Sequence, residues 1–327
     1  MTSYRLISFG LTIIFILISQ AAPLYAAALR IENSGLVFDQ AGRKIEIKHP
    51  FTRIISLYGA HTENLFDLGL KHQLIGVSRN EAYPPEALKK PVFSYHDDPE
   101  KFLAARPDLV LIRPMIDRGY ARLLRRLEQS GITVVSIQPR TIEEMYRYWE
   151  ALGLLVGKHH KARRMIDTFQ TAVLRFRKLA DQAEPKKRVY FEAMHKKMKT
   201  FTPDAMAIFA LRTAGGINLA SGAQSIRGTN IASFGKERIL ALAEQIDIYL
   251  AQYGAMNRPT KALIRNEPGF RIIKAIREDQ IFLIDEMIVS RPTMRLIKGI
   301  FTIGQILYPT IFNEQARSLV QEALAYR

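Results

Sequence analysis

The sequence contains no cysteine among its 327 residues, and this absence removes several kinds of chemistry at once. Disulfide bonds, thiolate metal sites, cysteine nucleophiles and lipid attachment at cysteine are all excluded. Any metal ligand must therefore be a histidine, a tyrosine or a carboxylate. Familiar catalytic motifs are also missing, since the chain has no G-x-S-x-G elbow, no P-loop, no H-E-x-x-H and no G-x-G-x-x-G after a strand. No motif indicates an enzyme.

Acidic residues are in the minority: 31 Asp and Glu stand against 47 Lys and Arg, which gives a formal charge of +16. Such an excess favours contact with an anionic partner, either a phospholipid surface, a nucleic acid or an acidic ligand. The basic run over residues 158–199 has no nucleic-acid fold signature, so we predict no nucleic-acid site. The remaining composition is that of a globular protein with room for two lobes.

The N-terminus has the pattern of a secretory signal peptide. Arg5 precedes an apolar run over residues 6–18, and small residues follow over 21–28. A membrane anchor is the alternative, but this run reaches only about 20 Å as a helix, whereas a hydrocarbon core is about 30 Å thick. We therefore predict a cleaved signal peptide over residues 1–28.

Strand and helix patterns alternate along the rest of the chain. Residues 36–47 predict a small hairpin within a leader of residues 29–50, which is followed by an α/β lobe over 51–157 and a second over 185–327. The predicted strands cover residues 53–57, 74–77, 109–112, 132–137, 188–191, 247–250 and 281–284. Because these strands are apolar on both faces, they indicate parallel sheets covered by helices on two sides.

Two helices are predicted with defined ends. One covers residues 60–68, with Thr62 as a plausible N-cap and Gly69 as its stop. The other covers residues 158–182, which lack Gly and Pro, within a linking segment of 158–184. The predicted fold class is therefore α/β: two doubly wound lobes with mainly parallel sheets, joined by one long helix, with a ligand cleft between the lobes.

Several short motifs occur in an order and spacing that resemble a known family. They are residues 53–57 followed by Thr62 and Glu63, then 68–69, 75–78, 83–85, 100–110, 131–132, 214–218, 233–242, and 290–292 with Arg295. Together they resemble the iron(III) siderophore, haem and cobalamin periplasmic-binding family, the substrate-binding proteins of ABC importers. The resemblance implies two lobes on one backbone helix, with the ligand between them.

The resemblance also implies a location and roles for two acids. Because the chain lacks the cysteine of lipoprotein members, a free periplasmic protein of a Gram-negative organism is implied. One glutamate on each lobe of family members pairs with arginines of the membrane permease, and Glu100 and Glu237 occupy the matching positions. The alternative is ordinary acidic charge at a helix N-terminus. Cobalamin binders of the family often line the cleft with tryptophan, but Trp149, the only tryptophan here, falls in a helical region away from the strand ends. The resemblance therefore disfavours cobalamin as the ligand.

Polar and aromatic residues just after the predicted strands are candidates for the ligand cleft. Arginine suits anionic oxygens and tyrosine rings stack on flat ligands, although each such residue could instead bond only its own loop. The candidates are Tyr58, His61, Tyr83, Tyr95, His96, Arg113, His195, Arg227, Tyr253 and Arg291. His61, His96 and His195 could coordinate haem iron or a divalent cation, or be ordinary polar residues, so no metal ligand is assigned.

These features predict a monomeric receptor that captures an iron chelate, haem or a corrinoid and delivers it to an ABC permease. It would have no catalytic residues and no cofactor of its own. An exported enzyme using the same cleft and a membrane-associated adaptor using the basic surface remain as alternatives. The sequence leaves the identity of the ligand open.

Overall fold

The computed structural model describes residues 28–325 except 33–34, 227 and 256. All but the last residue of the predicted signal peptide, and the cleft candidate Arg227, therefore lie outside the described residues. Within the part that is described, no helix is both long and apolar enough to cross a bilayer.

The N-terminal lobe is built on a five-stranded parallel sheet of order β6-β5-β4-β7-β8. Its strands are β4 (Ile54–Ser56), β5 (Leu74–Ser78), β6 (Val92–Phe93), β7 (Leu109–Ile112) and β8 (Thr133–Ser136). Alternate residues of β7 enter different cores: Leu109 packs with helices α1 (Gly59–Asp67) and α5 (Ile142–Leu155), whereas Val110 packs with α2 (Pro99–Ala105), α3 (Pro114–Gly119) and α4 (Ala121–Gln129). The short turn η1 (Pro85–Lys89) precedes β6. Both faces are covered, as predicted.

The C-terminal lobe contains a seven-stranded mixed sheet, ordered β12-β13-β10-β9-β14-β15 with β11 paired to β9. Its strands are β9 (Arg188–Met194), β10 (Lys199–Phe201), β11 (Ile217–Asn218), β12 (Gln224–Ser225), β13 (Ile231–Ser233), β14 (Ile248–Tyr253) and β15 (Ile281–Asp285). Pairing is parallel among β9, β11, β14 and β15 but antiparallel for β10, β12 and β13. The prediction of mainly parallel sheets is therefore exact for the first lobe and half right for the second.

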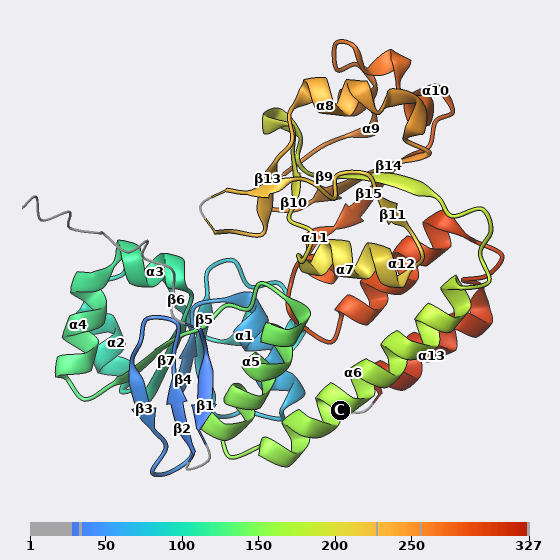
Figure 1. The fold of residues 1–327 in the computed structure, drawn as a ribbon. Coiled ribbons are helices and arrows are strands. Elements are labelled where there is room, and N and C mark those ends of the chain that lie inside the picture. Colours follow the sequence, from blue (N-terminus) through green and yellow to red (C-terminus); the bar gives the residue numbers. More distant parts are fainter. Residues whose placement is uncertain (1–27, 33–34, 227, 256, 326–327) are drawn as a thin grey trace, which may run out of the picture.

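Helices cover the second sheet on both faces (Figure 1). One face packs against α7 (Met206–Thr213), α11 (Glu286–Val289) and α12 (Leu296–Leu307), and α13 (Glu314–Leu324) packs on α12. The other face carries α8 (Lys236–Ala241), α9 (Lys261–Arg265), α10 (Lys274–Arg277) and the short turns η3 (Ala243–Gln245) and η4 (Phe270–Ile272). A further turn, η2 (His195–Lys197), follows β9.

A 22-residue helix, α6 (His159–Ala180), connects the lobes along one side of the molecule (Figure 1). Met165, Phe169, Val173 and Phe176 form its buried face, at the spacing expected of an amphipathic helix. They belong to one hydrophobic core that also contains residues of α1 and α5 from the first lobe and of α7 and α12 from the second. The predicted helix over 158–182 is confirmed, and the lobes share a continuous core rather than a flexible linker.

The leader forms a small antiparallel sheet of β1 (Arg30–Glu32), β2 (Leu36–Phe38) and β3 (Lys44–Glu46). The β2 and β3 strands are the predicted hairpin, and β1 adds a strand that the sequence pattern did not indicate.

The predicted N-cap of the first helix is wrong. Helix α1 begins at Gly59 with Tyr58 as its N-cap, so Thr62 lies inside the first turn. The Thr62 hydroxyl donates instead to the Ser56 hydroxyl at 2.9 Å, which ties the helix to the end of β4. The Thr62 hydrogen bond therefore links α1 to β4 and does not cap the helix. The predicted end of the helix at Gly69 is confirmed, and Gly69 has a φ of 87°.

Candidate functional site

Tyr58, between β4 and α1, is approached by charged side chains of both lobes. The Arg113 guanidinium carbon lies 4.7 Å from the centre of its ring. Burial raises the pKa of Tyr58, while the nearby charges of Arg113 and of Arg291, from the other lobe, oppose that rise. Arg113 and Arg291, both predicted cleft residues, therefore converge on a third.

Arg291 reaches across to the backbone at the start of α1. A Cβ atom at Gly59 would collide with the Arg291 Nη1 atom, so the guanidinium lies directly against the start of α1 in the space that glycine leaves open. Neither Nη1 of Arg291 nor Nε of Arg113 has a hydrogen-bond partner among the described residues, although both atoms are buried. A buried donor without an acceptor costs about 1–3 kcal/mol, so both arginines are suited to receive an acceptor from a ligand.

Glu81 adds one acidic group beside these arginines. Burial raises the pKa of Glu81, and the nearby charge of Arg291 opposes that rise. Its Oε2 atom is buried without a hydrogen-bond partner among the described residues. The carboxylates of Glu286 and Glu63 also lie near Tyr58, where their charges raise its pKa, so the junction offers both cationic and acidic groups to a ligand.

Next to this group, a buried ion pair joins the lobes. Arg295 donates from Nε and Nη2 to the two carboxylate oxygens of Glu63, both at 2.6 Å, and the Glu63 side chain is fully buried. The Arg295 guanidinium carbon also lies 4.2 Å from the centre of the Tyr83 ring. Tyr83 was predicted to line the cleft, and the structure places it over this pair.

The carbonyl of Pro292 forms a second link between the lobes. It accepts hydrogen bonds from Asn64 Nδ2 at 3.0 Å and from Trp149 Nε1 at 3.1 Å. Trp149 is fully buried on α5, in the helical region where the sequence placed it. Together with the Glu63–Arg295 pair, these bonds fasten the segment after α11 to the first lobe.

His61 does not face an open cleft. Its Nδ1 lies 2.7 Å from the Tyr148 hydroxyl and its Nε2 lies 3.1 Å from the carbonyl oxygen of Ile112. Burial lowers the pKa of His61 to about 3, so the ring is neutral at physiological pH. With both nitrogens engaged, this predicted ligand residue is a packing residue in this arrangement.

Tyr95 and His96 stand apart from the Tyr58 group. Their rings pack on each other and on Tyr120, with centroid distances of 4.6 to 5.0 Å. Tyr253, at the end of β14, remains 44% exposed, so its ring is open to a partner. The structure therefore gathers Tyr58, Tyr83, Arg113 and Arg291 from the predicted set and leaves Tyr95 and His96 in a separate aromatic cluster.

His195 lies in a buried polar cluster inside the second lobe. Its Nδ1 is 2.8 Å from Oε2 of Glu192, which also accepts a hydrogen bond from the Tyr249 hydroxyl. Its Nε2 is 3.6 Å from Oε2 of Glu267, and Glu267 in turn pairs with Lys236 at 2.5 Å. Among the described residues there is no group of three or more His, Asp or Glu side chains that could hold a metal ion.

This cluster predicts a pH dependence of stability. Burial lowers the pKa of His195, but the hydrogen bond and charge of Glu192 and the charge of Glu267 outweigh it and raise the pKa above the usual value of about 6.5. Its stabilising contribution is therefore complete below about pH 6.5 and is lost as the pH rises through the folded-state pKa. The unfolding free energy from denaturant titrations should therefore fall as the pH is raised above about 6.5.

The slope of that fall should be smaller in His195→Gln. His72→Gln is the matched control, because the His72 side chain is exposed. Equal slopes in wild type and His195→Gln would contradict the assignment.

Glu100 and Glu237 occupy equivalent places on opposite lobes. Glu100 is the second residue of α2 and Glu237 is the second residue of α8, and both are exposed. Glu100 pairs with Arg126 at 3.4 Å across the surface. Both acids are therefore at helix N-termini and accessible to a partner, as the sequence predicted.

Two α/β lobes on one long helix, with charged residues of both lobes meeting between them, define a bilobal binding protein. Residues 54–287 match the family model described as "Periplasmic binding protein", and the chain belongs to that family. This match confirms the resemblance recognised from the sequence motifs.

Individual relatives are similar over most of their length. The chain is 24% identical to an uncharacterized ABC transporter substrate-binding lipoprotein, YvrC, of Bacillus subtilis, over 84% of this chain and 86% of the relative. It is 24% identical to the vitamin B12-binding protein of Vibrio cholerae, over 77% and 87%. A crystal structure of a possible iron-binding periplasmic solute-binding protein from Staphylococcus epidermidis aligns with a TM-score of 0.70 and 25% identity, over 80% of this chain and all of that one.

Several residues of the junction were not among the predicted site residues. Glu63 and Arg295 appeared only as parts of motifs, and Glu81 and Glu286, whose charges act near Arg291 and Tyr58, were not singled out. Glu63 pairs with a residue 232 positions away, so no local pattern could have connected the two. The sequence indicated only that Glu63 lies one turn into the helix that follows β4.

Proposed function

We propose that this protein is a periplasmic substrate-binding protein of an ABC importer that captures an anionic iron chelate, either haem or a ferric siderophore. The observation that carries the proposal is the convergence of Arg113 and Arg291, from opposite lobes, on Tyr58. Each has a buried guanidinium nitrogen with no acceptor among the described residues. Carboxylate or catecholate oxygens of a ligand would satisfy both.

A corrinoid is the second candidate, because the vitamin B12-binding protein of Vibrio cholerae is among the relatives. The buried guanidinium nitrogens of Arg113 and Arg291, which have no acceptor among the described residues, favour a ligand with carboxylate or catecholate oxygens. A thermal-shift comparison of haemin, ferrichrome, ferric enterobactin and cyanocobalamin tests the choice, since a ligand that binds only the folded state raises the melting temperature. Absence of a shift with all four ligands would overturn the proposal.

Binding should depend on Arg291. Arg291→Ala removes a charge-assisted hydrogen bond to the ligand and should weaken binding by about 1.5–3 kcal/mol, without loss of the fold. Calorimetric titration with the ligand that gives the largest thermal shift measures the change in affinity. Arg271→Ala, which removes an exposed arginine of the same lobe, is the control and should bind like wild type. Unchanged affinity in Arg291→Ala would remove this residue from the site.

The proposed location is the periplasm, reached through a signal peptide over residues 1–28. The absence of cysteine supports a free protein rather than a lipoprotein, in contrast to the relative from Bacillus subtilis. We propose the membrane permease as its partner, with Glu100 and Glu237 as the contacts. Membership of a binding-protein family supports a receptor over an exported enzyme or an adaptor.

A further inference from the structure

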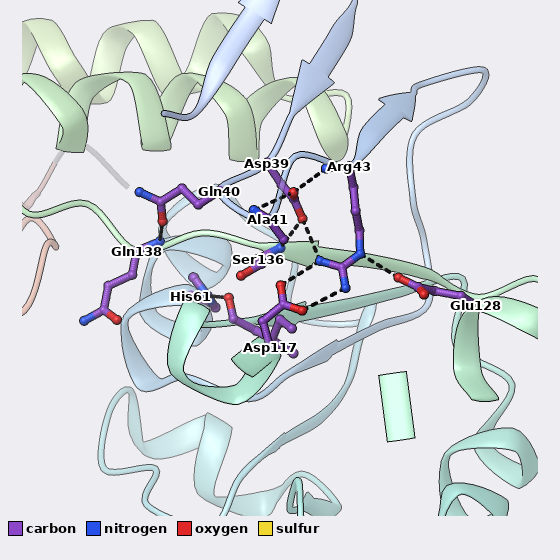
Figure 2. Close-up of polar contacts among 10 residues, drawn as sticks. Asp39, Gln40, Ala41, Arg43, His61, Asp117, Glu128, Ser136 and Gln138 are labelled. Atoms are coloured by element: carbon purple, nitrogen blue, oxygen red, sulfur yellow. Dashed lines mark hydrogen bonds and ion pairs between the residues drawn. The ribbon is translucent and has the colours of Figure 1, made fainter. Parts of the chain in front are cut away.

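The leader lies outside the residues that match the family, yet it is bound to the edge of the first sheet. The β2–β3 turn, residues 39–43, contacts β8, which is an edge strand. The Ser136 N–H donates to Asp39 Oδ2 at 2.9 Å, and the Gln40 N–H donates to the Ser136 carbonyl at 2.9 Å. The Gln138 N–H donates to Gln40 Oε1 at 2.6 Å, so the leader holds the backbone where β8 ends (Figure 2).

Arg43 is the centre of a second set of contacts. Figure 2 shows its guanidinium between carboxylates of three elements: Asp39 of the leader, Asp117 of α3 and Glu128 of α4. Its two terminal nitrogens donate to both oxygens of Asp117, at 2.7 and 3.0 Å, and Nε donates to Glu128 at 2.6 Å. Burial lowers the pKa of Arg43, but these acidic partners outweigh that effect and raise it, so the residue stays charged.

Asp117 connects this ion-pair group to the ligand face. The Asp117 N–H donates to the Arg113 carbonyl at 3.2 Å, within the first turn of α3. Helix α3 has only six residues, too few to be stable without outside contacts. The side chain of Asp117 is anchored by Arg43, while its backbone is bonded to Arg113, whose guanidinium lies over the Tyr58 ring.

We propose that Arg43 of the leader is a positioning residue for ligand binding: by holding Asp117, it fixes α3 and thereby places Arg113 over Tyr58. The effect on affinity rests on the proposed function. The effect on the mobility of α3 does not, because it is a property of the unliganded protein. The leader then contributes to ligand binding by positioning Arg113.

Two isosteric variants separate positioning from general stability. Asp117→Asn and Glu128→Gln each remove one negative charge facing Arg43, but only Asp117 lies on the helix that begins after Arg113. Asp117→Asn should weaken binding about tenfold, the lower end of the loss found when a residue that orients a metal ligand is removed, whereas Glu128→Gln should stay within about twofold. Asp117→Glu, which keeps the charge, should recover part of the affinity.

Affinity is measured with haemin, ferrichrome, ferric enterobactin and cyanocobalamin, and amide hydrogen exchange over residues 113–119 is measured without ligand. Exchange there should be faster in Asp117→Asn than in Glu128→Gln, at similar melting temperatures. Equal exchange in the two variants overturns the positioning role, whether or not any ligand binds. If none of the four ligands binds the wild type, the proposed function fails, while the exchange comparison still decides the role of Arg43.

Discussion

Arg295→Met is expected to lower the unfolding free energy by about 3–5 kcal/mol, the largest loss of stability among the substitutions considered. The change leaves the Glu63 carboxylate fully buried at the junction of the lobes without the arginine that donates to both of its oxygens. A buried charge that loses its counter-ion costs far more than the intact pair contributes. Guanidinium chloride unfolding followed by circular dichroism measures the loss.

A surface ion pair provides the comparison. Arg126→Met breaks the pair between Arg126, which is 52% exposed, and Glu100, which is 69% exposed. It should change the unfolding free energy by no more than about 1 kcal/mol. Arg295→Met combined with Glu63→Leu should regain much of the loss, because no unpaired charge then remains. If Arg295→Met alone lowered stability as little as Arg126→Met does, the Glu63–Arg295 pair would not hold the lobes together.

Removing both exposed helix-start acids, in Glu100→Ala with Glu237→Ala, should abolish most ligand-stimulated ATPase activity of the reconstituted permease. Complementary charges across an interface set its association rate and specificity, and these two acids project from opposite lobes. Ligand affinity in solution should not change, because both side chains lie on the outer surface rather than at Tyr58.

Glu86→Ala with Glu314→Ala is the matched control for this pair. It removes the same charge from exposed positions, 56% and 77% accessible, on other elements and should leave stimulation intact. Stimulation at the wild-type level in the Glu100 and Glu237 variant would contradict the docking assignment.

The joined core explains how far the two lobes can move. Helix α6 contributes its apolar face to a core shared by both lobes, and the Pro292 carbonyl is bonded from α1 and α5. A large hinge rotation would break these contacts together, so we expect small adjustments on binding rather than wide closure.

Most of the fold could be predicted from local apolar patterns. Residues 109–112 were predicted as a strand and form β7, because a fully buried parallel strand needs a short unbroken apolar run. The antiparallel strands β10, β12 and β13 were missed, since each has only two or three residues and no alternation long enough to detect. Sequence therefore predicted the central strands better than the edge of the second sheet.

The site was predicted less completely for a different reason. A position directly after a strand places Tyr58 and Arg113 at the carboxyl end of the first sheet, whereas Arg291 follows α11 and was selected with the motif of residues 290–292. The same rule selected His61, because sequence cannot show that its ring turns inward to Tyr148. The ion pairs of Arg43 and Arg295 join residues far apart in the chain, so their formation depends on the tertiary fold.

The chain carries its own optical reporter of the junction. Trp149 is the only tryptophan, and its indole nitrogen is bonded to the carbonyl of Pro292 in the opposite lobe. Excitation near the red edge of protein absorbance therefore selects a single fluorophore located where the lobes meet. Water entering that contact would shift its emission to longer wavelength, so separation of the lobes can be followed in the unlabelled protein.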